Sequence, residues 1–245
     1  MIAEERVRAE LVETSRELHA RGWVANHDGN VTARLGPGRF LSTPTAISKG
    51  AVSSESLIVV DGMGEVLQGT RKAFSELKLH LAAYRRRPDI GCCIHAHPPT
   101  ATGFAVARRS FGPPFMAEPV VSIGREVPLV DFGMPGDLDL DELGRADVLL
   151  LANHGVLAVG PDLETALLRI ELVEHMAKIA LVAHQLGGPV ALPESLVASL
   201  QKKHESLFRE QPAMDAGQAS SAPSAPSASG EAAGSIVADA LKRFR

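Results

Sequence analysis

The chain has 245 residues, of which 45% are hydrophobic and 22% are charged, and its formal net charge is −4. This composition is typical of a globular protein, and its scattered Lys and Arg residues provide no basic surface for nucleic acid or an anionic membrane. No apolar segment approaches the roughly 18–20 residues of a membrane span, and the acidic N-terminus does not resemble an export signal, so we expect a cytoplasmic protein.

The first predicted element is a helix over residues 4–21, because apolar side chains recur there at helical spacing and Gly22 follows as a stop signal. The turn-rich residues 26–34 come next and run into a short strand. Gly29 would let the backbone and the Asn30 amide approach a ligand closely, although the same pattern is also an ordinary hairpin signal.

A hydroxyl-rich loop occupies residues 42–50 and contains Thr43, Thr45 and Lys49. Such a loop offers hydroxyl donors and one ammonium group to an anionic ligand. Loops of this composition are also common where nothing binds. A buried strand is predicted over residues 57–60.

A helix is predicted over residues 75–84, with Ser75 as its N-cap and Glu76 in its first turn. A glutamate in a first turn commonly does no more than complement the helix dipole. This helix directly precedes a strand that carries two histidines, which makes Glu76 a candidate functional carboxylate.

The two histidines, His95 and His97, flank Ala96 at the end of an apolar run. Side chains at positions i and i+2 of a strand point to the same face, so both imidazoles can reach one ion. Imidazole nitrogens bind Zn²⁺ at about 2.0–2.1 Å, and a catalytic zinc needs a third protein ligand and an open position. The alternative is a strand end with two half-buried histidines.

A second buried strand is predicted over residues 148–151 and runs into Asn153-His154-Gly155. A histidine that leaves a buried strand beside a glycine is well placed to be the third ligand, and His154 has this position.

Periodicity and Pro/Gly punctuation predict the remaining elements. They are short helices over residues 98–107 and 139–143, a strand over residues 127–130, and longer helices over residues 161–187 and 193–208. The only cysteines, Cys92 and Cys93, are neighbours that cannot readily pair with each other, and we expect them to be buried.

The composition changes after Gln211 to Ala, Ser, Pro and Gly. We therefore predict one folded domain over residues 1–210, a disordered linker over residues 211–235, and a short helix over residues 236–245.

Several short motifs resemble, in order and spacing, the class II aldolase/adducin family. They are Gly29-Asn30-Val31, Thr43-Pro44-Thr45, Ser75-Glu76, Arg87-Pro88-Asp89, His95-Ala96-His97 and Asn153-His154-Gly155. The resemblance spans about residues 5–210. It implies an α/β fold in α/β/α layers, with a mostly antiparallel central sheet flanked by helices. It also implies a cyclic homotetramer with active sites at subunit interfaces.

The resemblance implies specific roles as well. In enzymes of the family three histidines bind Zn²⁺, and these correspond to His95, His97 and His154. In the aldolase branch a glutamate that follows a serine is the acid/base, and this corresponds to Glu76.

Residues that bind the sugar phosphate in the family correspond to Gly29, Asn30, Thr43, Thr45 and Ser75. The expected function is thus a zinc-dependent aldolase that cleaves a short ketose or ketose phosphate through a metal-stabilised enediolate. A carboxylate near the metal would move the proton on carbon, provided its pKa is shifted toward neutrality.

Three alternatives stay open from the sequence. A dehydratase of the same family uses zinc and a carboxylate for elimination. The epimerases of the family carry aspartate where this chain has Glu76, which favours the aldolase. A non-catalytic adducin-like assembly protein is disfavoured, because the adducin branch lacks the full zinc set.

Two departures from the family pattern concern the substrate. The family's phosphate site has a glycine and a second serine where this chain has Ala46 and Phe74, so the phosphate cradle is expected to be incomplete. The only tyrosine, Tyr84, matches a structural position, which leaves Glu118 as the candidate acid on the aldehyde side.

Overall fold

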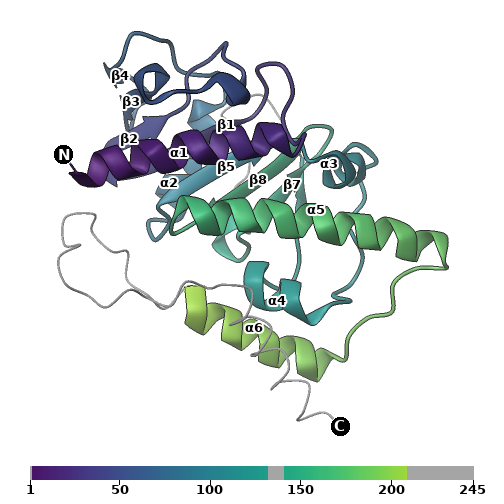
Figure 1. Ribbon diagram of the computed structural model, residues 1–245. Coiled ribbons are helices and arrows are strands. Elements are labelled where there is room, and N and C mark those ends of the chain that lie inside the picture. Colours follow the sequence, from purple (N-terminus) through teal and green to yellow (C-terminus); the bar gives the residue numbers. More distant parts are fainter. Residues whose placement is uncertain (1, 132–140, 209–245) are drawn as a thin grey trace.

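A single mixed sheet organises the part of the chain that the computed structural model describes, residues 2–131 and 141–208. Its eight strands run in the order β4-β3-β2-β1-β5-β8-β7-β6 (Figure 1). Each pair of neighbours is antiparallel except β6 and β7, which are parallel. The predicted α/β fold with a mostly antiparallel sheet is confirmed.

The strands are β1 (Asn30–Gly36), β2 (Arg39–Ser42), β3 (Ile58–Asp61), β4 (Val66–Gln68), β5 (Cys92–Ala96), β6 (Leu129–Val130), β7 (Val148–Leu151) and β8 (Gly155–Gly160). The helices are α1 (Ile2–Ala20), α2 (Leu77–Arg86), α3 (Pro99–Val106), α4 (Ala117–Ile123), α5 (Leu163–Gln185) and α6 (Glu194–Phe208). Short 3₁₀ turns cover Lys49–Ala51, Ser54–Ser56 and Asp141–Gly144.

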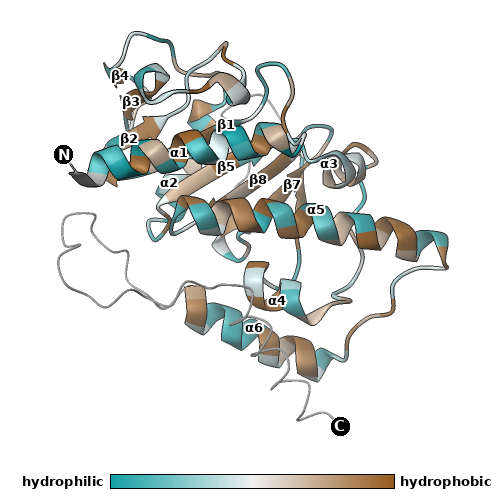
Figure 2. Cartoon of the chain, viewed as in Figure 1, coloured by the Kyte–Doolittle hydropathy of each residue, from teal (hydrophilic) through white to brown (hydrophobic). Residues whose placement is uncertain are grey.

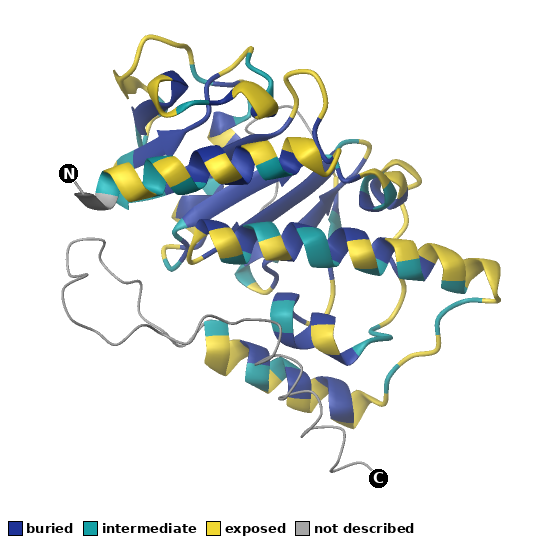
Figure 3. Cartoon of the chain, in the orientation of Figure 1, coloured by how far each residue is buried: buried dark blue, intermediate teal, exposed yellow. Residues whose placement is uncertain are grey.

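Helices cover both faces of the sheet. α1 and α5 lie side by side across one face, and α2 lies behind the sheet in the same view (Figure 1). Because side chains alternate along a strand, β5 contributes Ile94 to the apolar cluster under α1 and α5 and Cys93 to the cluster under α2. The burial and hydropathy patterns agree: the central strands are apolar and buried, whereas the helices alternate (Figures 2 and 3).

A third, smaller apolar cluster joins α4 to α6. These two helices pack against each other, and α4 also packs against α5 (Figure 1). α5 begins at Leu163 because the Asp162 side chain caps it, accepting a hydrogen bond from the Thr165 backbone N–H at 2.7 Å.

The start of α2 differs from the prediction. The helix begins at Leu77, so Glu76 is the N-cap residue and Ser75 lies outside the helix. The buried Phe74 ring packs edge-on against the His80 ring, with 5.2 Å between centroids. Anchoring Phe74 in the core places a turn before the helix, closed by the Leu77 backbone N–H on the Phe74 carbonyl oxygen.

The other predicted elements occur close to their expected positions, and Cys92 and Cys93 are buried as expected. The helix predicted over residues 139–143 lies partly outside the described residues, and its remainder is a 3₁₀ turn. The predictions for residues 211–235 and 236–245 also concern residues outside the described part. None of the helices in the described part is long and apolar enough to span a membrane.

Candidate metal centre

His95 is the most deeply buried of the three candidate ligands. It lies on β5 between Asn30 of β1 and Leu157 of β8, and its side chain has no exposed surface. Its Nδ1–H donates to the Val156 carbonyl oxygen at 2.9 Å. Because a carbonyl only accepts, the proton must be on Nδ1, and this leaves the Nε2 lone pair free to bind a metal.

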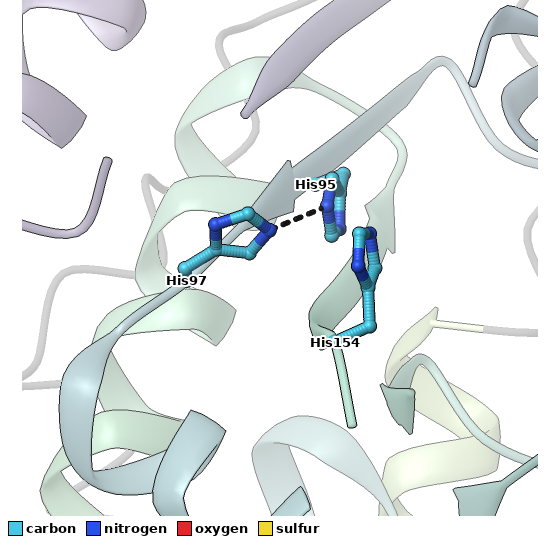
Figure 4. A group of neighbouring side chains, drawn as sticks. All are labelled: His95, His97 and His154. Atoms are coloured by element: carbon cyan, nitrogen blue, oxygen red, sulfur yellow. Dashed lines mark hydrogen bonds between the residues drawn. The ribbon is translucent and has the colours of Figure 1, made fainter. Parts of the chain in front are cut away.

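His97 follows the end of β5, and its backbone N–H donates to the Trp23 carbonyl oxygen at 2.8 Å. Its Nε2 lies 3.0 Å from Nε2 of His95 (Figure 4). Its other ring nitrogen, Nδ1, lies 3.7 Å from the carboxylate of Asp28. The two histidines therefore share one face, as the i, i+2 spacing predicts.

His154 lies in the turn between β7 and β8. Asn153 holds this turn with a left-handed backbone (φ 57°), and its Oδ1 accepts a hydrogen bond from Arg108 Nε at 2.9 Å. Gly155 is required next, because a Cβ there would overlap the His97 ring and the Ala96 carbonyl oxygen. The turn thereby stacks the His154 ring on the His95 ring, with 4.6 Å between centroids.

The metal-binding atoms of His95, His97 and His154 all lie within 4.8 Å of one another (Figure 4). Burial lowers the pKa of His95 to about 3, and burial also lowers the pKa of His97. Both imidazoles are therefore neutral at physiological pH, which is the form that binds a metal.

Glu76 lies beside this cluster, and both of its carboxylate oxygens accept a hydrogen bond. His154 Nε2 donates to Oε1 at 2.6 Å, and Asn30 Nδ2 donates to Oε2 at 2.8 Å. Oε2 also lies 3.6 Å from His95 Nε2. The structure thus brings together five predicted site residues: His95, His97, His154, Glu76 and Asn30.

The pKa of Glu76 departs from the expectation of a shift toward neutrality. Burial raises it, but the His154 hydrogen bond, the electrostatic interaction with the nearby His95 ring and the Asn30 hydrogen bond together lower it below its ordinary value. A metal ion on His154 Nε2 would replace the proton that makes the first of these hydrogen bonds.

The other predicted substrate-binding residues differ in burial: Gly29 and Thr43 are buried, whereas Thr45 and Ser75 are exposed. Gly29 is buried with φ 69°, and a Cβ there would overlap the Val24 side chain. Thr43 is buried, and its hydroxyl interacts with the backbone N–H and carbonyl of Val31, so it is committed to the fold. Thr45 and Ser75 are exposed, so a ligand can reach both side chains.

Lys49 does not present its charge to the loop, contrary to the sequence interpretation. Its side chain is buried, and Nζ donates to the carbonyl oxygens of His27 (2.9 Å) and Ile47 (3.0 Å). Burial lowers the pKa of Lys49 to about 8. The residue therefore ties together the two loops that precede Asn30 and follow Thr45.

A polar contact between β1 and α2 was missed from the sequence. Thr32 Oγ1 lies 2.8 Å from His80 Nδ1 and 3.0 Å from the Tyr84 hydroxyl. Two residues along a strand span about 6.6 Å, and four residues along a helix span about 6 Å. Because these distances are nearly equal, the strand and the helix that form the Asn30–Glu76 pair also form the Thr32–His80 pair. The sequence signal for this contact was the spacing: Thr32 is two positions after Asn30 on the strand, and His80 is four positions after Glu76 on the helix.

Tyr84 has the structural position that was expected for it, and burial raises the pKa of its hydroxyl well above the ordinary value. Glu118 is exposed in the first turn of α4, a helix that packs on α5 and α6.

Comparison with known proteins identifies the family of this chain. The family model described as "Class II Aldolase and Adducin N-terminal domain" matches residues 9–181. The chain belongs to the class II aldolase and adducin family.

Two relatives show the range of reactions among similar family members. The chain is 31% identical over 189 residues to 3-oxo-tetronate 4-phosphate decarboxylase of Pectobacterium atrosepticum, covering 74% of this chain and 86% of that one. It is 32% identical over 177 residues to L-fuculose phosphate aldolase of Methanocaldococcus jannaschii, covering 71% and 94%.

A solved structure of L-fuculose 1-phosphate aldolase superimposes with a TM-score of 0.73 at 28% identity, covering 82% of this chain and 96% of that chain. The family predicted from the motifs is therefore confirmed, and the chain is similar to L-fuculose-phosphate aldolases within it. Relatives of both kinds are enzymes, which supports an enzyme over an adducin-like assembly protein.

Proposed function

We propose that this protein is a zinc-dependent lyase that breaks a carbon–carbon bond next to a carbonyl group in a short ketose or ketose phosphate. The observation that carries this proposal is the Glu76 carboxylate beside three converging imidazoles. Retro-aldol cleavage is the reaction that we favour, as the sequence predicts.

The donor set fits Zn²⁺. Nε2 of His95 and Nε2 of His97 lie 3.0 Å apart, a spacing at which two imidazole nitrogens need a proton or a cation between them. A tetrahedral zinc with bonds of about 2.0–2.1 Å separates its ligand nitrogens by about 3.3 Å, close to this spacing. A zinc ion held by the three histidines would supply a Lewis acid for charge on a substrate carbonyl oxygen and its neighbouring hydroxyl oxygen.

Glu76 has the role of the acid/base at carbon. In the cleavage direction it would deliver a proton to the carbon next to the carbonyl, and in the condensation direction it would remove that proton. The ionised carboxylate suits removal of the proton in the condensation direction. The hydrogen bond from Asn30 orients one carboxylate oxygen in both reaction directions. Gly29, Thr45 and Ser75 would contact the substrate from the two neighbouring loops, and Thr43 would act by fixing its loop.

Decarboxylation is a second candidate, and it was not among the reactions predicted from the sequence. Loss of CO₂ from a 3-oxo acid leaves charge on the same two oxygens, but it needs no group to take the proton from a hydroxyl that becomes an aldehyde. The chain has one tyrosine, and this Tyr84 is buried against Thr32. The relative from Pectobacterium atrosepticum also carries the name of a decarboxylase.

Both reactions can leave the same fragment. Cleavage of a 2-ketose 1-phosphate between carbons 3 and 4, or decarboxylation of a 3-oxo-tetronate 4-phosphate, yields dihydroxyacetone phosphate. A proton on its hydroxymethyl carbon should therefore exchange with solvent if Glu76 moves it.

The test follows proton exchange into dihydroxyacetone phosphate and into dihydroxyacetone in D₂O by NMR, together with the zinc content of the purified protein. Wild-type protein should contain one zinc per chain and catalyse exchange, and His97→Ala should lose both properties. Zinc-replete protein that exchanges a proton on neither dihydroxyacetone phosphate nor dihydroxyacetone would contradict the proposal. Assays with L-fuculose 1-phosphate and with 3-oxo-tetronate 4-phosphate then separate the aldolase from the decarboxylase.

We also infer that the active species is a cyclic homotetramer with sites at subunit interfaces. Membership of the family supports this assembly. Light scattering on the active, zinc-loaded protein tests it, and an active monomer would contradict it.

A further inference from the structure

A residue of α5 holds the segment that follows His97. Glu174 is buried, with 3% of its side chain exposed. Its carboxylate accepts hydrogen bonds from the backbone N–H groups of Thr100 (3.0 Å) and Ala101 (2.9 Å) and from the Thr100 hydroxyl (2.8 Å). α3 and α5 are direct neighbours in the fold (Figure 1).

These groups belong to the first turn of α3, where backbone N–H groups have no partner within the helix. The residue at the N-cap position is Pro98, whose side chain makes no capping hydrogen bond. Glu174 therefore caps α3 from another helix.

The charge of Glu174 is accounted for at this position. A buried carboxylate is costly unless it is hydrogen-bonded and its charge is compensated. The positive end of the α3 dipole faces Glu174, and Lys178 Nζ lies 3.4 Å from its carboxylate.

The link between this cap and the metal centre is short and stiff. Only Pro98 and Pro99 lie between His97 and Thr100. Each proline ring restricts φ, which is −59° at Pro98, so few torsions can absorb a displacement of α3. A shift of Thr100 would move the His97 backbone and with it the His97 ring.

We propose that Glu174 is a positioning residue for the metal ligand His97, acting through the cap that it forms on α3. The inference rests on the proposed function in one respect, that His97 binds zinc. Outer groups that orient a metal ligand typically change metal affinity about 10- to 100-fold when they are removed. We expect an effect of this size from Glu174, although it acts through the backbone.

The experiment measures zinc affinity by competition with a chromophoric chelator, using Zn²⁺ alone as the probe. Glu174→Ala removes all three hydrogen bonds and should weaken zinc binding at least about tenfold. Glu174→Gln retains one acceptor oxygen but loses the charge, so its effect should be smaller. Thr100→Val removes only the hydroxyl hydrogen bond and should have the smallest effect.

The matched control is Asp162→Ala. This substitution also removes a helix cap, because Asp162 accepts the 2.7 Å hydrogen bond from the Thr165 backbone N–H at the start of α5. Asp162 does not cap the helix that follows His97. Its zinc affinity should stay within twofold of wild type. The visible spectrum of the cobalt(II)-substituted protein gives a second readout, because it reports ligand geometry: it should change in Glu174→Gln and stay unchanged in Asp162→Ala.

The outcomes separate the two proposals. If wild-type protein binds zinc and the Glu174 and Thr100 variants bind it equally well with an unchanged cobalt spectrum, the positioning role is wrong and the proposed function survives. If wild-type protein binds no zinc, both are wrong. If Glu174→Ala does not fold, Glu174→Gln and Thr100→Val decide the question.

Discussion

Glu76 is oriented by contacts from two different parts of the chain. Asn30 of β1 and His154 of the β7–β8 turn each donate to one of its carboxylate oxygens. A glutamate whose only task was to complement the helix dipole would need neither contact. This geometry is what a proton-transfer group beside a metal requires.

We therefore expect Glu76→Gln to lower kcat by about 10²–10⁴-fold, which is the usual contribution of a positioned acid/base. Zinc content should be unchanged, because the three histidines are intact. Steady-state kinetics and metal analysis on the same preparation check both statements. Turnover close to wild type would reduce Glu76 to a partner of the helix dipole.

Ala46 shows how one residue departs from the family pattern at a cost. Its φ is 56°, in the left-handed region that favours glycine. A residue with a Cβ is destabilised by roughly 1–2 kcal/mol in this conformation. Glycine avoids this cost, but its greater entropy in the unfolded state lowers the stability of the folded protein by about 0.4–1 kcal/mol.

Ala46→Gly should accordingly raise the free energy of unfolding by up to about 1 kcal/mol, or raise Tm by about 2–4 °C. Thermal unfolding followed by circular dichroism measures the change. The control is Ala25→Gly at an exposed loop position without positive φ, which should lower Tm. A decrease in both variants would show that Ala46 is not strained.

Phe74 requires a different interpretation from the one that the sequence suggests. It stands where the family has a serine, but its ring is buried against His80 as part of the apolar cluster under α2. Replacing it with serine would leave a cavity in the core, so such a variant could not report on phosphate binding alone.

At the scale of elements, Asp147 joins four parts of the fold. The residue directly precedes β7 and is fully buried, and its carboxylate pairs with Arg87 after α2 (2.9 Å), Arg169 of α5 (2.6 Å) and His204 of α6 (3.3 Å). Burial raises its pKa, but the His204 hydrogen bond and the charges of Arg169 and Arg87 lower it well below the ordinary value.

Asp147→Asn should destabilise the protein by about 3–5 kcal/mol at pH 7, because it leaves buried cations without their counter-charge. Urea unfolding measures the difference. The control is Glu17→Gln, which breaks a surface pair with Arg21 and should cost less than about 1 kcal/mol. Equal effects of the two substitutions would show that the buried network adds nothing.

The same network predicts a pH dependence. A carboxylate whose folded pKa is depressed contributes stability above its unfolded pKa, and this contribution is lost as the pH falls through the folded pKa. The stability difference between wild type and Asp147→Asn should therefore be constant above about pH 5 and shrink progressively at lower pH. A difference that grows on acidification would contradict this assignment.

At the scale of the whole molecule, the described residues contain an extensive apolar core. Its three apolar clusters are built from residues between Val7 and Leu200. Deleting residues 211–245 should therefore leave oligomeric state, Tm and activity largely unchanged, since an Ala/Ser/Pro-rich segment cannot build a core. Light scattering and kinetics test this, and a truncated protein that dissociates would place the deleted residues in an interface.

Sequence patterns predicted most of the helices, the buried strands next to the histidines, and the grouping of His95, His97 and His154, but they did not predict α4 or β4. These features depend on local spacing: period 2 along β5 puts His95 and His97 on one face, and a short turn returns His154 beside them.

Only the tertiary structure decided the contacts between residues that are far apart in the chain. Local patterns placed Glu76 inside a helix, whereas packing of Phe74 made it the N-cap and brought its carboxylate to Asn30 and His154. The burial of Lys49 and the cap that Glu174 forms on α3 likewise depend on how loops and helices pack together. Hydrophobic periodicity specifies which face of an element is buried, but the polar partner that it meets there depends on how the elements are stacked.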